Sequence, residues 1–129
     1  MNKKLLATLA ALLFTLPALA DVLIFGGTRG VGLETVRQLR EKGEGVTVMV
    51  RETSDLAKLN EIDGVTLVVG DAMEMDTVTA AYASGEFDAA VSTLSGNPAV
   101  GYAVDSVGSI HAIDGAIAAG VKHFVLVSS

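Results

Sequence analysis

The sequence contains no cysteine and no tryptophan, only two prolines, and few aromatic residues (5%). The lack of cysteine excludes a disulfide framework, a thiolate nucleophile and a cysteine-based metal site, and it is compatible with a reducing or an oxidising compartment. Half of the 129 residues are hydrophobic, so valine, leucine, isoleucine and alanine must supply most of any core. A chain of this length forms one domain at most.

Positive charge is also scarce in this chain. Nine lysines and arginines stand against 15 aspartates and glutamates, which gives a net charge of −6 and an isoelectric point near 4.7. Phosphate backbones and anionic lipid headgroups repel a protein of this charge. We therefore expect no nucleic acid as partner and no membrane once the N-terminal segment is removed, and the sequence predicts no particular oligomeric state.

Residues 1–20 have the layout of a secretory signal peptide. Two lysines near the start precede an apolar run over 5–16, and Ala18-Leu19-Ala20 is a small-x-small cleavage sequence. The apolar run is shorter than the roughly 20 residues of a comfortable membrane span. We expect a periplasmic or secreted protein whose mature chain starts at Asp21, whereas an uncleaved segment would act as a membrane anchor.

From residue 21 onward, short apolar runs alternate with amphipathic stretches. The runs predict five strands, at 22–25, 46–50, 65–69, 89–94 and 124–127. The stretches between them predict helices at about 30–42, 76–84 and 104–119, with a short helix after an N-cap at Ser54. The predicted apolar face of the first helix holds Val31, Val36 and Leu39, and that of the last holds Val104, Val107, Ile110, Ile113 and Ile117.

This alternation predicts the fold class. Strands that alternate with helices pair in parallel through right-handed crossovers, and continuously apolar strands fit a sheet covered on both faces. The predicted fold is an α/β doubly wound parallel sheet, Rossmann-like, with five strands in the order 3-2-1-4-5. The sequence stops directly after the fifth strand, so we expect 21–129 to be a Rossmann-like domain that is incomplete at its C-terminus.

The run Gly26-Gly27-Thr28-Arg29-Gly30-Val31-Gly32 joins the first strand to the first helix. Glycines in such a turn let the backbone approach a pyrophosphate closely, and the start of the following helix supplies free N–H groups and a partial positive charge. The strand–turn–helix context is the one in which this kind of glycine motif indicates a dinucleotide site. The sequence therefore predicts a small-molecule dinucleotide as ligand.

The chain resembles the N-terminal half of a short-chain dehydrogenase/reductase, nearest the atypical NmrA-like branch of NAD(P)-binding proteins. The resemblance covers 22–129, although the spacing G-x-x-x-G-x-G differs from the G-x-x-G-x-x-G of atypical members. It rests on the glycine turn, Val50-Arg51, Gly70-Asp71-Ala72, Val91-Ser92-Thr93-Leu94, and the run from Ala118 to Ser129.

Arg51 closes the second strand, at the position where a domain selecting NADP places a cation for the 2′-phosphate. Arg29 in the glycine turn is a second candidate, because guanidinium groups match phosphate oxygens. The sequence therefore favours NADP over NAD. Thr28 either donates to a phosphate or stabilises the turn, and both arginines have an alternative as solvated surface residues.

By resemblance, Asp71 contacts the adenine amino group beside Ala72, with a helix cap as the alternative role of this carboxylate. Ser92, Thr93 and Leu94 would line the ribose and nicotinamide, unless they simply end a strand.

Catalytic residues are not assigned by the sequence. The family's Tyr-x-x-x-Lys pair is absent, because Tyr82 is followed four residues later by Glu86 and Tyr102 by Ser106. Ser128 is a candidate by resemblance, since a serine near the end of the fifth strand contacts substrate in catalytic members. His111 and His123 lack metal-ligand spacing, so no metal site is expected.

Three functions fit these features. The first is the NAD(P)-binding domain of a reductase-like protein, which would transfer hydride to an unknown small acceptor in a longer form. The second is a non-catalytic NADP-binding module that senses redox state. The third is the cofactor half of a nucleotide-sugar epimerase.

Overall fold

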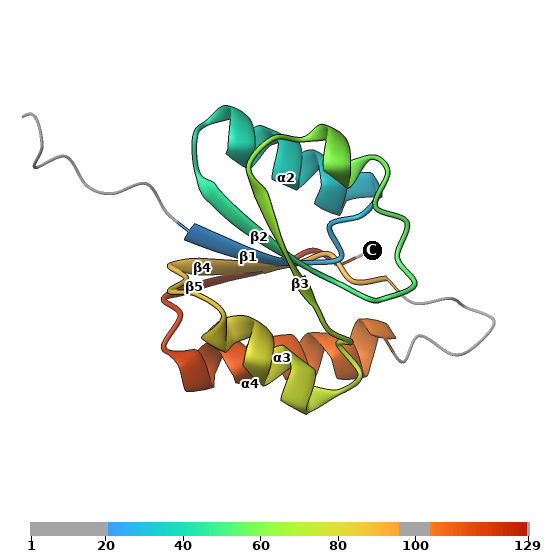
Figure 1. Cartoon of the computed structure of the whole chain (residues 1–129). Coiled ribbons are helices and arrows are strands. Elements are labelled where there is room, and N and C mark those ends of the chain that lie inside the picture. The colour runs from blue at the N-terminus through green and yellow to red at the C-terminus, as the bar shows by residue number, and fades with distance from the viewer. Residues whose placement is uncertain (1–20, 96–103, 129) are drawn as a thin grey trace, which may run out of the picture.

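The computed structural model describes residues 21–95 and 104–128, which form a parallel sheet between two layers of helices (Figure 1). The sheet order is β3-β2-β1-β4-β5, and every pair of neighbouring strands is parallel. The predicted fold class is therefore confirmed. The strands are β1 (Asp21–Phe25), β2 (Gly45–Val50), β3 (Val65–Val69), β4 (Ala89–Ser92) and β5 (His123–Leu126), and the α-helices are α2 (Gly30–Glu41), α3 (Met75–Ala83) and α4 (Ser109–Ala119).

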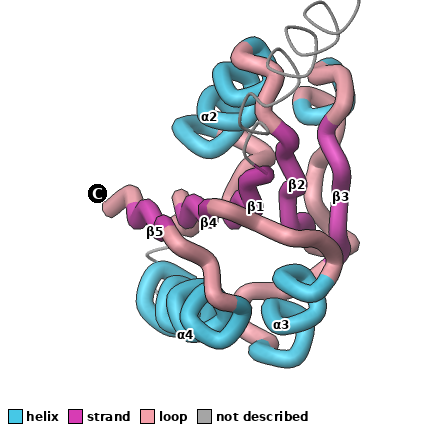
Figure 2. The backbone as a smooth tube through the Cα atoms, turned by 90° about the vertical axis from the view of Figure 1, so that its left-hand side faces the viewer, coloured by secondary structure: helices cyan, strands magenta, loops and turns pink. Residues whose placement is uncertain are grey.

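The chain reverses its direction across the sheet after β3. The first two crossovers place α2 on one face. The return from β3 to β4 places α3 on the other face, and the crossover from β4 to β5 places α4 beside α3 there, as Figure 2 shows end-on. Right-handed crossovers require this change of face when the direction of travel reverses. The carboxyl ends of β1 and β4 therefore lie side by side at the switch point.

Each face of the sheet has its own core. Ile24, Val36 and Val48 belong to the cluster under α2, and Phe25, Val78 and Ala90 belong to the cluster under α3 and α4. Strand β1 contributes to both clusters and its last four residues are buried. The run of four apolar residues in the sequence is explained by this position at the centre of the sheet.

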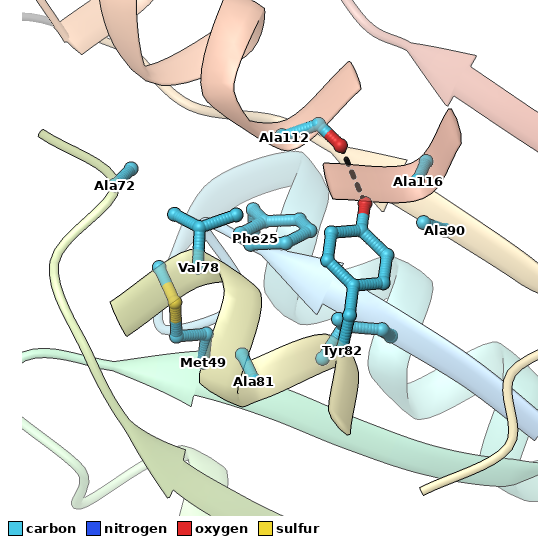
Figure 3. Close-up of a cluster of buried hydrophobic side chains, with 10 residues drawn as sticks. Phe25, Met49, Ala72, Val78, Ala81, Tyr82, Ala90, Ala112 and Ala116 are labelled. Carbon is cyan, nitrogen blue, oxygen red and sulfur yellow. Dashed lines mark hydrogen bonds between the residues drawn. The ribbon is translucent and has the colours of Figure 1, made fainter. Parts of the chain in front are cut away.

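The buried face of α4 differs from the one predicted. Ile110 and Ile117 are 55% and 73% exposed, whereas the residues that face the core are small (Ser109, Ala112, Gly115 and Ala116). The reason is a close approach to α3. A Cβ added to Gly115 would stand 2.6 Å from the ring of Tyr82, whose hydroxyl donates to the carbonyl oxygen of Ala112 at 2.6 Å (Figure 3).

Smaller differences concern the ends of elements. The segment Val104–Gly108, predicted as part of one long helix, is a π-helical turn before α4, and β4 ends at Ser92 rather than 94. The short helix after 54 is reduced to a 3₁₀ turn at Leu59–Glu61. Ser54 caps no helix, because its hydroxyl instead accepts the N–H of Arg51 at 3.0 Å. Val31, predicted on the buried face of the first helix, is 59% exposed.

Within the described residues, no helix is both long enough and apolar enough to span a membrane.

Candidate dinucleotide site

The glycine turn between β1 and α2 lies at the carboxyl edge of the sheet. Gly26 and Gly30 adopt φ angles of +86° and +56°, a left-handed conformation that favours glycine. Arg29 between them is extended, and α2 begins at Gly30. Two glycines thus turn the chain sharply out of a central strand and into a helix.

Two other glycines in this motif are required by close packing rather than by φ. A Cβ on Gly27 would stand 2.8 Å from Val48 in the core. A Cβ on Gly32 would overlap the carbonyl oxygen of Gly26 and stand 2.5 Å from the hydroxyl of Thr93. The first turn of α2 is therefore pressed against the end of β1.

The start of α2 fits an anionic group. The first N–H groups of an α-helix have no partner within the helix. Among the described residues no side chain caps this helix, and its first turn carries no acid. A Cβ at Gly30 would meet nothing within 4 Å, so the turn leaves open space where the free N–H groups begin. Thr28 is half-buried and Val31 exposed beside this space.

Two cations flank the turn on the exposed side. Arg29 and Arg51 are both exposed. Within the described part of the chain, the only salt bridge joins Arg37 to Glu34. Hydrogen bonds from Gln38 and from Arg37 lower the pKa of the Glu34 carboxyl. Neither Arg29 nor Arg51 is therefore neutralised by an acid within 21–95 and 104–128.

The end of β3 brings Asp71 to the same edge. The N–H of Gly70 donates to the carbonyl oxygen of Val50 at 2.9 Å, which extends the β2–β3 pairing by one step, to the residue before Asp71. One carboxylate oxygen of Asp71 accepts the N–H of Met73 at 2.9 Å. This contact makes a local turn before α3, and the carboxylate caps no helix directly.

Ala72 and Leu94 lie beneath this edge rather than on its surface. Ala72 is buried, Leu94 packs against the core under α3 and α4, and both stand 3.2 Å from a Cβ added to Gly108. The carbonyl oxygen of Ala72 accepts Nδ1–H of His111 at 2.7 Å. His111 thus has a structural contact that ties α4 to the loop after β3.

Ser92 and Thr93 point to opposite faces of the sheet. Ser92 is fully buried, two residues after Ala90 and on the same side, and its hydroxyl has no hydrogen-bond partner among the described residues. The Thr93 hydroxyl donates to the carbonyl oxygen of Gly26 at 2.9 Å. The sequence offered no signal for this contact between residues 67 positions apart.

The proton-donor candidates are not gathered at this edge. The hydroxyl of Tyr82 is buried against α4, and burial raises its pKa above the usual range for tyrosine. Ser128 is exposed just beyond β5, while Tyr102 and Ser129 lie outside the described residues. The described residues include no group of three or more His, Asp or Glu suited to a metal ion.

The parallel sheet, the switch point and the glycine turn that opens α2 define a Rossmann-type dinucleotide-binding domain. Residues 26–129 match the NAD(P)H-binding family. The chain belongs to this family. No curated protein matches the chain.

Solved structures with the same fold are longer. The Bordetella bronchiseptica enzyme WbmG, in complex with NAD, is 20% identical to this chain with a TM-score of 0.76. The match covers 87% of this chain and 38% of the WbmG chain. The Thermotoga maritima UDP-glucose 4-epimerase with UDP-glucose is 20% identical with a TM-score of 0.74, and the match covers 84% of this chain and 38% of the epimerase. The Campylobacter jejuni UDP-Glc/GlcNAc 4-epimerase is 20% identical with a TM-score of 0.73, covering 83% and 36%. The chain spans less than two fifths of each, and at this identity the likeness concerns the fold.

Proposed function

We propose that this chain is the NADP-binding part of a reductase-like protein whose longer form transfers hydride between the cofactor and a small acceptor. The observation that carries the proposal is the pair of exposed arginines, Arg29 and Arg51, beside a glycine turn with an uncapped helix start. NADP and NAD differ only in the 2′-phosphate, so a guanidinium at the end of β2 is the group that would favour NADP.

In this proposal each part of NADP is bound by a different group of the chain. The N–H groups at Gly30 and Val31 bind the pyrophosphate, Arg51 binds the 2′-phosphate, and the free carboxylate oxygen of Asp71 accepts the adenine amino group. The nicotinamide then lies toward the ends of β4 and β5. When bound, the nicotinamide supplies the hydride chemistry.

The test compares NADP(H) and NAD(H) binding by calorimetry in the unmutated chain and in Arg51→Ala. A hydrogen bond to a charged group contributes about 1.5–3 kcal/mol, so Arg51→Ala should weaken NADP binding roughly 10- to 100-fold and hardly change NAD binding. Lys122→Ala is the matched control, because it removes one exposed cation before β5, at the opposite edge of the sheet. Equal affinities of the unmutated chain for both cofactors would contradict the NADP preference.

A second candidate is the cofactor half of a nucleotide-sugar epimerase. It is favoured by the epimerases among the structures of similar fold, one of which is described with UDP-glucose and another with bound NAD. Tighter binding of NAD than of NADP, together with binding of UDP by the full-length protein, would favour this function. A non-catalytic redox-sensing module would instead bind NADP and NADPH with different affinities without turnover in any length of chain.

We also propose that residues 1–20 direct export and are removed. Strand β1 begins at Asp21, so cleavage after Ala20 leaves every described element in place. N-terminal sequencing of the protein from the cell envelope should begin at Asp21. Recovery of a chain starting at Met1 in the cytosol would contradict export.

A further inference from the structure

Thr93 joins three elements at the carboxyl edge. It is the first residue after β4, and its N–H donates to the carbonyl oxygen of Phe25 at 2.9 Å, which extends the β1–β4 pairing by one step. Its hydroxyl donates to the carbonyl oxygen of Gly26 at 2.9 Å and lies 3.3 Å from that of Phe25. Because a hydroxyl has a single hydrogen, the shorter contact to Gly26 is the principal one.

The Thr93 hydroxyl is also enclosed by glycines. A Cβ on Gly26 would stand 2.8 Å from this oxygen, and a Cβ on Gly32 would stand 2.5 Å from it. The oxygen thus occupies the space that two missing side chains leave between the turn and the first turn of α2. Any larger residue at either glycine would displace it.

The contact to Gly26 fixes the direction of a donor in the turn. The carbonyl group of Gly26 and the N–H of Gly27 belong to one planar peptide and point in opposite directions. Since Thr93 holds the carbonyl oxygen on the β4 side, the N–H of Gly27 is held facing away from β4. Val48 packs closely against Gly27, because a Cβ added to Gly27 would stand 2.8 Å from the Val48 side chain.

We propose that Thr93 is a positioning residue that acts through the Gly26 peptide to hold the glycine turn in its pyrophosphate-binding conformation. This inference rests on the proposed dinucleotide function. It gives the hydroxyl a role inside the turn, instead of the predicted contact with ribose or nicotinamide. A purely structural Thr93 would affect stability but would not discriminate between ligands with and without a pyrophosphate.

The experiment uses two ligands and four variants of the full chain. NADP⁺ contains the pyrophosphate, whereas 2′-AMP retains the adenine, the ribose and the 2′-phosphate without it. Thr93→Val and Thr93→Ala remove the hydroxyl, and Thr93→Ser keeps it. Thr35→Val is the matched control, because its hydroxyl also donates to a backbone carbonyl, that of Val31 at 2.8 Å, on the exposed side of the same helix.

The loss of one neutral hydrogen bond should weaken NADP⁺ binding by Thr93→Val about 3- to 10-fold. We expect Thr93→Val to bind 2′-AMP as the unmutated chain does. Thr93→Ser should keep NADP⁺ binding, and Thr35→Val should bind both ligands as the unmutated chain does. In the ligand-free chain, amide hydrogen exchange at Gly27 and Thr28 should be faster in Thr93→Val than in Thr35→Val.

Two kinds of failure are distinguishable. If the unmutated chain binds neither NADP⁺ nor NAD⁺, the proposed function is wrong and the role of Thr93 in cofactor binding is wrong with it. If the unmutated chain binds NADP⁺ and Thr93→Val binds it equally well, or loses NADP⁺ and 2′-AMP to the same extent, only the positioning role is overturned. Unchanged amide exchange in the turn would also overturn that role.

Discussion

Alanine substitutions at two glycines of α2 should separate stability from cofactor binding. At Gly32 the new Cβ would overlap the carbonyl oxygen of Gly26 and stand 2.5 Å from the Thr93 hydroxyl. Both obstacles are held in place by the hydrogen bond between them, at 2.9 Å. Since a backbone carbonyl cannot rotate away as a side chain can, the turn itself must move.

Gly30 lies only two residues away but has open space around it. A Cβ there would meet nothing within 4 Å, and only its φ of +56° resists a side chain. A left-handed conformation costs an L-residue roughly 1–2 kcal/mol. We therefore expect Gly30→Ala to lower the free energy of unfolding by about 1 kcal/mol, and Gly32→Ala by about 3 kcal/mol, the upper end of the usual range for overpacking.

Urea unfolding followed by circular dichroism measures both losses. Calorimetric titration of the folded variants should find NADP and NAD binding weakened together in Gly30→Ala, because its methyl group occupies the space proposed for the shared pyrophosphate. Gly120→Ala is the matched control, since Gly120 also has a left-handed φ, of +72°, and open space around it, at the end of α4. It should lose similar stability and keep full binding. The reasoning would be refuted if Gly32→Ala were as stable as Gly30→Ala, or if Gly30→Ala bound both cofactors normally.

Three further predictions concern the contact between α3 and α4, the ionisation of Tyr82 and the turnover of NADPH. Gly115→Ala should lower the free energy of unfolding by about 1–2 kcal/mol in urea titrations. The new Cβ would stand 2.6 Å from the Tyr82 ring, and this overpacking outweighs the helix propensity that alanine adds. A stabilised variant would contradict the tight α3–α4 contact. Burial raises the pKa of Tyr82, so its contribution to stability is fully present below the ordinary tyrosine pKa of about 10 and should be lost progressively as pH rises from there toward the higher folded-state pKa. Tyr82→Phe should lose less stability over that interval. NADPH oxidation by the 129-residue chain with carbonyl or quinone acceptors should be undetectable by absorbance, because a positioned proton donor contributes roughly 10²–10⁴-fold and the residues that the structure describes place none at the turn. Steady turnover that depends on Gly30 would contradict this.

The sequence by itself determined the topology. Five apolar runs separated by helical stretches admit few arrangements, because crossovers are right-handed and neighbouring strands pair in parallel. The glycine turn could also be predicted from the sequence, because φ values of +86° and +56° are local requirements that favour glycine. These features depend on residues close together in the chain.

Only the tertiary structure decided how the helices and side chains meet. Periodicity predicted that Ile110 and Ile117 of α4 face the core, yet both are exposed and Gly115 and Ala112 face it instead. Their small size lets α4 approach Tyr82 closely, and pattern alone does not reveal how near a neighbour comes. The contact of Thr93 with Gly26 likewise joins residues 67 apart. It exists because the reversal of the chain after β3 places β4 beside β1, and no local propensity encodes a contact of that kind.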